Sequence, residues 1–523
     1  METFPMFCNQ CQEAARGTGC DKMGVCGKTP ETAAELDGLI ARLIRLARGA
    51  ARSTTIDPAT ARLVVDGLFL TVTNVNFDPD TIRTWENRVN AAADQLDAPA
   101  LEAGRCGLPP CDNEDVQSLR ELVLFGLKGM ASYDHHAAAL DQLNHETDDF
   151  MVRALAACAD DADANVLTDL ALKCGEVSVE IMARLDGAHT GRYGKQEATE
   201  VTLEVRDNPA ILISGHDLRD LEDLLEQTRG TGVDVYTHGE MLPAHAYPFF
   251  KQYDNLVGNY GGAWYEQQRE FASFNGPIIM TTNCIKKPRE SYLDRIWTTG
   301  LVGWPGLKHV ANRKTDGRKD FTTIIEQAKT CAAPTNIETG SVTCGFGHDQ
   351  ILAVLDKVVA AVKSGAIKRF VVMAGCDGHH KKRQYYTDLA EALPQDAVIL
   401  TAGCAKYRYN KLNLGDIGGI PRVLDAGQCN DSYSLAVVAL KLTEVFGAES
   451  INDLPLSFDI GWYEQKAVCV LLALLHLGVK GIRVGPTLPA FFSPGVAQVL
   501  SDTFGIKGIG SVAEDLPAIM AGG

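Results

Sequence analysis

The chain has 523 residues, of which 46% are hydrophobic and 22% are charged, and its formal net charge is −18. A chain of this length exceeds what one hydrophobic core can organise, so about two to four domains are expected, and the composition excludes a disordered or collagen-like protein. The acidic balance argues against a nucleic-acid partner, because nucleic-acid binding usually requires a basic surface.

The cysteines and the N-terminal residues favour a reducing compartment. The 15 cysteines are odd in number and spread over a large chain, whereas secreted disulfide scaffolds are short and cysteine-dense. Residues 1–8 lack the basic and apolar segments of a signal peptide. The longest apolar run, 467–479, contains His476 and is too short to span a bilayer. We expect a cytoplasmic protein without membrane insertion, whose clustered cysteines bind metal or act as thiols.

The first 30 residues contain a cysteine box, Cys8-x2-Cys11-x8-Cys20-x5-Cys26, with several glycines between the cysteines. Four thiolates in a short, glycine-rich loop can hold a [4Fe-4S] cubane. The alternative is a structural zinc site with four thiolate ligands. Zinc sites more often repeat a C-x2–4-C pair, and the second pair here is separated by five residues, which favours the iron–sulfur interpretation.

The region from 31 to about 206 is expected to be helical. Apolar residues recur at helical spacing from Leu36 to Ile44, and similar stripes follow over 112–130, 150–158 and 164–186. Runs typical of β-strands are scarce in this region. We therefore predict that residues 1–207 form the cysteine box and a helical bundle domain.

From residue 208 onward, short apolar runs alternate with amphipathic helices, which predicts parallel α/β structure. The region is long for one such domain, so we predict two, over 208–342 and 343–523. The expected strands are 210–213, 232–237, 277–282, 369–373, 396–401 and 421–425.

Each of these six runs is followed by a residue that can ligate a metal. The six residues are His216, Glu240, Cys284, Cys376, Cys404 and Cys429. One such residue alone would be read as a turn or a small buried side chain. Six at the carboxyl ends of strands, where functional groups of parallel sheets gather, predict a centre with mixed sulfur, nitrogen and oxygen ligands, which suits iron in an unusual cluster. A nucleotide site is a poor alternative, because no G-x-G-x-x-G or P-loop follows a strand.

Two charged segments allow a structural and a functional interpretation. Glu464 and Lys466 precede an apolar helix, and the residues alone favour a solvated first turn, in which a glutamate is favourable. The basic run 379–383 is most simply a solvated helix face; its functional interpretation is a positive rim at the entrance of a site.

Taken together, the motifs resemble the hybrid cluster protein family (prismane proteins, hydroxylamine reductases) from end to end. The motifs are the cysteine box, Ser214–Asp217, Thr237–His245, Thr282–Cys284, Ala374–Gly378, Thr401–Tyr407 and Tyr463–Lys466. The cysteine spacing is similar to that of the class from anaerobes with an N-terminal [4Fe-4S] cubane. One departure is a helical region somewhat shorter than in long members.

The resemblance implies a fold, a set of ligands and an activity. The fold is a helical domain followed by two Rossmann-like parallel α/β domains. Cys8, Cys11, Cys20 and Cys26 would hold the cubane. A hybrid [4Fe-2O-2S] cluster would be held by His216, Glu240, Cys284, Cys376, Cys404, Cys429 and Glu464, with Cys376 as the persulfide position.

The implied activity is the two-electron reduction of hydroxylamine to ammonia and water, with nitric oxide reduction as a second role in nitrosative stress. An external electron donor protein would supply the electrons. Lys466 and the surroundings of His216 are the expected proton source, and Glu464 and Glu240 the expected mobile ligands.

Two alternatives stay open. A carbon monoxide dehydrogenase-like enzyme should carry more N-terminal cysteines and contain nickel. A non-catalytic redox sensor should carry a regulated partner or a DNA-binding element. Asn283, Tyr463 and Trp264 either line the cavity or pack in the core. The remaining cysteines are expected to be buried or free thiols: 106, 111, 158, 174, 331, 344 and 469.

Overall fold

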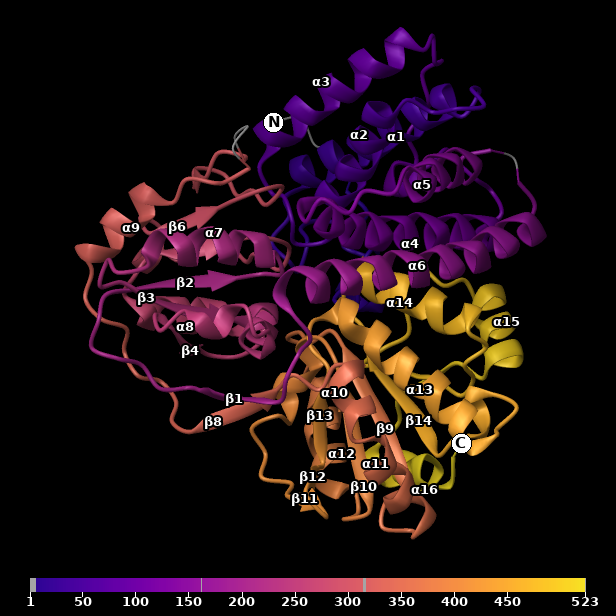
Figure 1. The fold of residues 1–523 in the computed structure, drawn as a ribbon. Helices are drawn as coiled ribbons and strands as arrows, with labels where there is room; N and C mark the ends of the chain where they lie inside the picture. The colour runs from indigo at the N-terminus through magenta and orange to yellow at the C-terminus, as the bar shows by residue number, and fades with distance from the viewer. Residues whose placement is uncertain (1–5, 161, 314–316, 523) are drawn as a thin grey trace.

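The computed structural model describes residues 6–160, 162–313 and 317–522. A layer of helices lies along one side of the molecule, and two α/β units, each built on its own sheet, lie against it (Figure 1). This arrangement confirms the predicted fold class, a helical region followed by two parallel α/β units. No described helix combines the length and the apolar character needed to cross a bilayer.

The helical layer consists of six helices whose starts are encoded locally. Asp57 and Asp78 accept hydrogen bonds from the first turns of their helices, and a proline follows each of them, which is the sequence pattern of a helix N-terminus. The helices are α1 (Pro30–Ala50), α2 (Pro58–Leu70), α3 (Pro79–Gln95), α4 (Glu114–Ala139), α5 (His145–Ala157) and α6 (Ala164–Tyr193).

The first sheet has six strands in the order β4-β3-β2-β5-β6-β7, and every pairing in it is parallel. Helices α7 (Leu218–Thr228), α8 (Gln267–Phe274) and α9 (Thr322–Lys329) accompany it. The strands are β2 (Ala210–Ser214), β3 (Asp234–His238), β4 (Leu256–Asn259), β5 (Ile278–Met280), β6 (Ile296–Thr298) and β7 (Lys308–His309). Because the strands are parallel, all their carboxyl ends lie on the same side of the sheet.

The second sheet is also parallel, in the order β13-β10-β9-β14-β15-β16. Its strands are β9 (Arg369–Gly375), β10 (Ala397–Thr401), β13 (Val423–Asp425), β14 (Leu456–Gly461), β15 (Arg483–Gly485) and β16 (Lys507–Gly508). Its helices are α10 (His348–Ala353), α11 (Leu355–Lys363), α12 (Gln384–Ala392), α13 (Ser432–Phe446), α14 (Gln465–His476), α15 (Pro494–Phe504) and α16 (Val512–Ala521).

Strand β14 is central in this sheet, yet the sequence did not predict it. Ser457 and Asp459 interrupt its apolar run. Both are buried, and Asp459 is accommodated because the Tyr385 hydroxyl donates a hydrogen bond to it at 2.9 Å. A buried polar residue with a hydrogen-bond partner thus interrupts the apolar pattern, so hydrophobicity alone does not predict this fully buried strand.

A two-stranded antiparallel sheet joins the two segments that flank the first α/β unit in the chain. It pairs β1 (Thr199–Thr202) with β8 (Ser341–Cys344). The predicted boundary at 342/343 falls within β8, and the domain boundaries stay predictions. A small hairpin, β11 (Asp416–Ile417) with β12 (Ile420–Pro421), completes the strands of the described residues.

Helix α14 joins the helical layer to the second sheet. It lies against α4 and α6 (Figure 1). A Cβ atom added to Gly129 of α4 would lie 2.4 Å from the carbonyl oxygen of Gln465, and one added to Gly175 of α6 would lie 2.2 Å from that of Leu472. Glycine at these two places lets the helix backbones approach closely. The amino end of α14, which carries Glu464 and Lys466, is therefore held tightly in place.

Candidate metal centre

One cavity between the two α/β units is lined by the residues that the sequence placed after strands. Trp264, Tyr463 and Lys466 also line it, so two of the three residues expected to face the cavity or the core border it. The candidate ligands around it are His216, Glu240, Cys284, Cys376, Cys404, Cys429 and Glu464.

The carboxyl ends of both sheets supply these side chains. His216 follows β2, Glu240 follows β3 and Cys284 follows β5 in the first sheet. In the second sheet, Cys376 follows β9, Cys404 follows β10, Cys429 follows β13 and Glu464 follows β14. Glu464 thus obeys the same rule as the other six, although its strand was not predicted. The carboxyl ends of the strands of two separate sheets must face each other for the cavity to exist.

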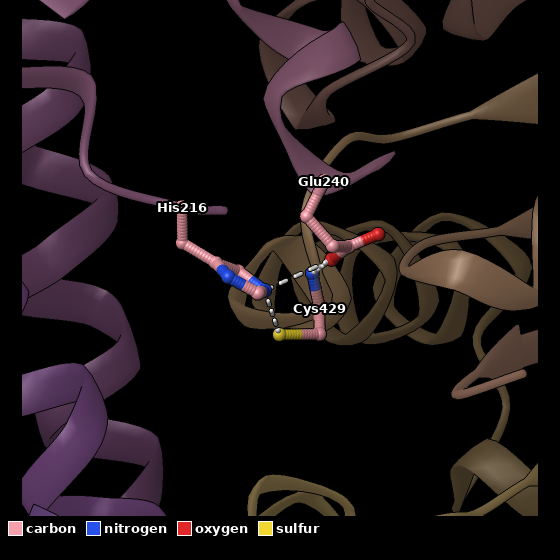
Figure 2. A group of neighbouring side chains, drawn as sticks. All are labelled: His216, Glu240 and Cys429. Atoms are coloured by element: carbon pink, nitrogen blue, oxygen red, sulfur yellow. Dashed lines mark hydrogen bonds and ion pairs between the residues drawn. The ribbon is translucent and has the colours of Figure 1, made fainter. Parts of the chain in front are cut away.

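Three of the seven candidates lie within direct contact of one another (Figure 2). His216 Nε2 lies 3.5 Å from Cys429 Sγ and 3.5 Å from Glu240 Oε2. Glu240 Oε2 also accepts a hydrogen bond from the Cys429 backbone N–H at 2.7 Å. Within the described residues this is the one group of three or more histidine, cysteine or acidic side chains whose ligand atoms all lie within 4.8 Å of each other.

The other side of the cavity is organised by Asn283. Its amide nitrogen donates to Glu464 Oε1 at 3.2 Å and to Cys284 Sγ at 3.4 Å, and its oxygen accepts from Lys466 Nζ at 2.8 Å. Lys466 Nζ also lies 2.9 Å from His216 Nε2 and 3.7 Å from Glu464 Oε1. Glu464 and Lys466 are each 2% exposed, so their interpretation as a solvated first turn is wrong.

Contacts behind the candidate ligands hold them in place. Thr282 Oγ1 lies 2.8 Å from His216 Nδ1, which leaves Nε2 directed into the cavity. The Gln428 amide donates to the backbone carbonyls of His216 and Glu240 at 3.1 and 2.8 Å. Sequence reasoning did not single out Gln428, because its partners lie about two hundred residues away and leave no local pattern.

Burial sets the electrostatics of the cavity. It raises the pKa of the thiols of Cys284, Cys376, Cys404 and Cys429, that of Cys376 to about 12. Burial also lowers the pKa of His216, to about 4, and the charge of Lys466 adds to that effect, so its imidazole is neutral. Burial raises the pKa of Glu464 as well, so the four thiols and Glu464 need positive charge beside them before they can ionise. Burial acts in the same direction on Glu240, but His216, Lys406 and Lys466 outweigh it and lower its pKa to about 2.

This donor set fits an iron–sulfur–oxygen cluster. Thiolates and neutral imidazole suit iron, and carboxylates suit an oxygen-bridged part of a cluster. Glu240 Oε1 is buried and has no hydrogen-bond partner, which is costly for a carboxylate unless a cation is bound there. The residues present therefore match the hybrid cluster that the sequence implied.

The cysteine box forms a compact loop. Cys8 and Cys20 exchange backbone hydrogen bonds of 3.0 and 2.8 Å, which brings the two ends of the loop together. Burial raises the pKa of the thiols of Cys8, Cys11 and Cys26, that of Cys8 to about 11, and neighbouring box cysteines add to the effect. Four cysteines carried by one compact loop are the ligand set that a [4Fe-4S] cubane uses.

The box is attached directly to the wall of the cavity. The backbone N–H of Gln12 donates to the carbonyl of Tyr463 at 2.9 Å. The side chain of Gln465 donates to the carbonyl of Gln10 at 2.7 Å. Residues adjacent to Cys11 in sequence thus contact residues on both sides of Glu464. No sequence pattern could reveal these contacts, because they join positions more than four hundred residues apart.

A second cavity extends from Cys376 and Cys429 between the second α/β unit and helices α4 and α6 of the helical layer. Its walls are almost entirely aliphatic and come from β9, β14, α13 and α14, as far as Leu477 and Val479. Such a cavity offers few hydrogen-bond partners, among them Tyr133 and Ser432, and favours small apolar molecules.

The other cysteines lie outside both sites. Cys106 donates to Asn9 Oδ1 and Cys469 to Ser178 Oγ, and both are buried. Cys111 and Cys331 are partly exposed. All 15 cysteines of the chain are free thiols in this structure.

Comparison with known proteins gives one consistent result. A family model described as the Prismane/CO dehydrogenase family matches residues 6–517. The hydroxylamine reductase of Nitratidesulfovibrio vulgaris is 55% identical over 552 residues, which cover 99% of this chain and 100% of that protein. The hydroxylamine reductase of Acetivibrio thermocellus is 56% identical over 542 residues, covering 99% and 100%.

A solved structure is similar in fold. Carbon monoxide dehydrogenase IV from Carboxydothermus hydrogenoformans superposes with a TM-score of 0.61 and covers 99% of this chain and 93% of its own. It is 15% identical in sequence, so the likeness concerns the fold alone.

Proposed function

The chain belongs to the Prismane/CO dehydrogenase family, and we propose that it is a hydroxylamine reductase with a [4Fe-4S] cubane and a hybrid iron–sulfur–oxygen cluster. It converts hydroxylamine, two electrons and two protons into ammonia and water. The observation that supports this most directly is the convergence of thiol, imidazole and carboxyl side chains from two sheets on one buried cavity. That donor set matches a mixed-ligand iron centre.

We assign the cubane to Cys8, Cys11, Cys20 and Cys26. We assign the hybrid cluster to His216, Glu240, Cys284, Cys376, Cys404, Cys429 and Glu464, with Cys376 as the persulfide position. When bound, these clusters supply the electrons and an iron position for the substrate.

The protein side chains provide binding and protons. The Lys466 ammonium lies in the cavity wall between His216 and Glu464. Burial alone would lower the pKa of Lys466, but the neighbouring Cys429 and Glu464 raise it, so the group is positive. We propose that Lys466 Nζ donates a hydrogen bond and then a proton to the hydroxylamine oxygen, so that this oxygen leaves as water.

The carboxylates of Glu240 and Glu464 have a different role. Each can shift from one oxygen to the other without a change of backbone, and Glu240 Oε1 is free of hydrogen bonds. We propose that this freedom lets the cavity admit hydroxylamine and release ammonia. Trp264 and Tyr463, which border the cavity, exclude bulk water and larger substrates.

Nitric oxide is a second candidate substrate. The aliphatic cavity that ends at Cys376 and Cys429 suits a small apolar gas better than it suits hydroxylamine. Two nitric oxide molecules, two electrons and two protons give nitrous oxide and water, so the same electron supply would serve. Electrons come from an external donor protein, and a cytoplasmic location agrees with the free cysteines.

A Glu464→Ala variant tests this assignment. We expect hydroxylamine turnover with reduced methyl viologen to be lost, while the paramagnetic resonance signal of the cubane is kept. Glu338→Ala, a partly exposed glutamate at the surface, is the matched control and should turn over normally. Unaltered turnover in Glu464→Ala would remove Glu464 from the mechanism, and nickel in the purified protein would favour the carbon monoxide dehydrogenase alternative.

A further inference from the structure

The basic run 379–383 lies beside the cysteine box. The carboxylate of Glu13, two residues after Cys11, accepts a hydrogen bond from the His379 backbone N–H at 2.6 Å and lies 3.2 Å from His379 Nδ1. Glu13 is 8% exposed and His379 is at the surface. A surface loop of the second α/β unit is thereby fixed against the loop that carries the box.

A second basic loop joins the first at this place. Lys286 Nζ lies 2.6 Å from His379 Nε2 and also donates to the Tyr265 carbonyl. Together the two loops present basic side chains that we call the basic surface: Lys286, Lys287, Arg289, His379, His380, Lys381 and Lys382. All of them are exposed or half-buried.

The charge of this surface is opposite to that of the chain. It has five lysine and arginine side chains, and Glu290 is the one acidic residue in the segments 286–290 and 379–382 that form it, whereas the whole chain carries −18. Glu13 is paired with His379 and buried. The lysines at 287, 381 and 382 are exposed, and their side chains form no salt bridge with the other residues that the structure describes. A patch of this kind attracts an acidic partner and accelerates its association.

Aromatic rings connect the basic surface with the cavity. The Trp264 ring lies 5.3 Å from the His379 ring and 4.5 Å from the Tyr463 ring, between ring centroids. Tyr463 borders the cavity, and its carbonyl accepts the hydrogen bond from Gln12. The basic surface thus lies above the region where the box and the cavity meet.

We propose that the basic surface is the docking site of a small acidic iron–sulfur electron carrier of the ferredoxin class. The proposal rests on the proposed function, since it names the donor that the reductase requires. Each reduced carrier gives up one electron and is oxidised, so two carriers serve each hydroxylamine, and the protons come from the solvent. A one-electron carrier matches the single cysteine box beside which it docks.

Charge reversal tests this surface. In the triple variant K287E/K381E/K382E, at low ionic strength, the second-order rate constant for oxidation of reduced ferredoxin should fall by about tenfold or more. The dissociation constant of the ferredoxin complex, measured by calorimetry, should rise by a similar factor, and the dependence of the rate on salt should flatten. The control K357E/K363E changes two exposed lysines on α11, outside the basic surface, and should behave like the wild type.

Two outcomes separate this proposal from the proposed function. Hydroxylamine turnover with reduced methyl viologen at high salt, where surface charges are screened, should be the same in all three proteins. Absence of that turnover in the wild type would overturn the proposed function instead. Equal rate constants and equal affinities for ferredoxin in K287E/K381E/K382E and K357E/K363E would overturn the docking site.

Discussion

Replacing Lys406 by methionine should strongly destabilise the second α/β unit. Lys406 lies two residues after Cys404, and its Nζ donates to Asp425 Oδ1 and to the Gly427 carbonyl, both at 2.6 Å. Neither Lys406 nor Asp425 is exposed. Burial alone would lower the pKa of Lys406, but Asp425 raises it, so the pair is ionised.

The expected size of the effect comes from what the substitution leaves behind. Methionine has a similar volume but no charge, so Asp425 would keep only the Gly427 N–H, at 3.0 Å, and its Oδ2 already has no partner. Removing one member of a buried ion pair costs about 3–5 kcal/mol, because the other charge stays buried without compensation. We expect a loss of that order in the free energy of unfolding.

The assay is equilibrium unfolding in urea, followed by fluorescence and circular dichroism on samples of equal iron content. Lys411→Met is the matched control, because Lys411 forms an equally short pair of 2.6 Å with Glu338 but is 29% exposed. Partly exposed pairs contribute about 1 kcal/mol or less. The double variant K406M/D425L should recover most of the loss. The reasoning is refuted if K406M and K411M lose equal stability.

Two further predictions follow from strain and from titration. Gly375→Ala should lower the free energy of unfolding by at least about 1–3 kcal/mol and abolish loading of the hybrid cluster but not of the cubane, because φ is +104° and the added Cβ would lie 2.1 Å from a carbonyl oxygen of β14. Iron analysis and paramagnetic resonance measure the loading of the two clusters. In the control Gly365→Ala, φ is +77° but no atom lies within 4 Å of the added Cβ, so this variant separates backbone strain from steric collision. Burial and the neighbouring Asp134 raise the pKa of Asp148 to about 7, so the folded state holds a proton that the unfolded chain has already released, and stability should fall by up to about 2 kcal/mol from pH 5.5 to 8. Asp148→Asn should remove this slope in urea unfolding, and an unchanged slope would show that another group causes it.

The sequence predicted the fold class and the positions of the expected strands because each of these runs contains adjacent β-branched or large apolar residues and alternates with an amphipathic helix. Strand β14 was not predicted because Asp459 interrupts its apolar run, and its buried hydrogen-bond partner, Tyr385, lies on helix α12, far away in the sequence. Six candidate ligands could be found by their place after strands. Glu464 could not be found in that way, and it was recovered through the family motif.

The contacts between distant segments lay beyond any sequence pattern. The hydrogen bond from Gln12 to Tyr463 and the contact of Glu13 with His379 depend on how the helical layer and the second sheet pack. The basic run 379–383 was most simply a solvated face. Residues 379–382 are exposed or half-buried, whereas Arg383 is buried and donates hydrogen bonds to Gln12 and to the Trp462 carbonyl. Its position beside the cysteine box follows only from the three-dimensional structure, and it is this position that supports the proposed docking of an acidic electron carrier.

The origin of the cavity walls limits how the molecule can move. With the proposed ligands bound, His216, Glu240 and Cys284 tie the first sheet to the same inorganic centre as the four ligands from the second. Rotation of one sheet against the other would stretch iron–ligand bonds. The enzyme cannot open and close around its substrate like a hinged two-domain protein, so turnover must rely on fixed passages and on movements of single side chains.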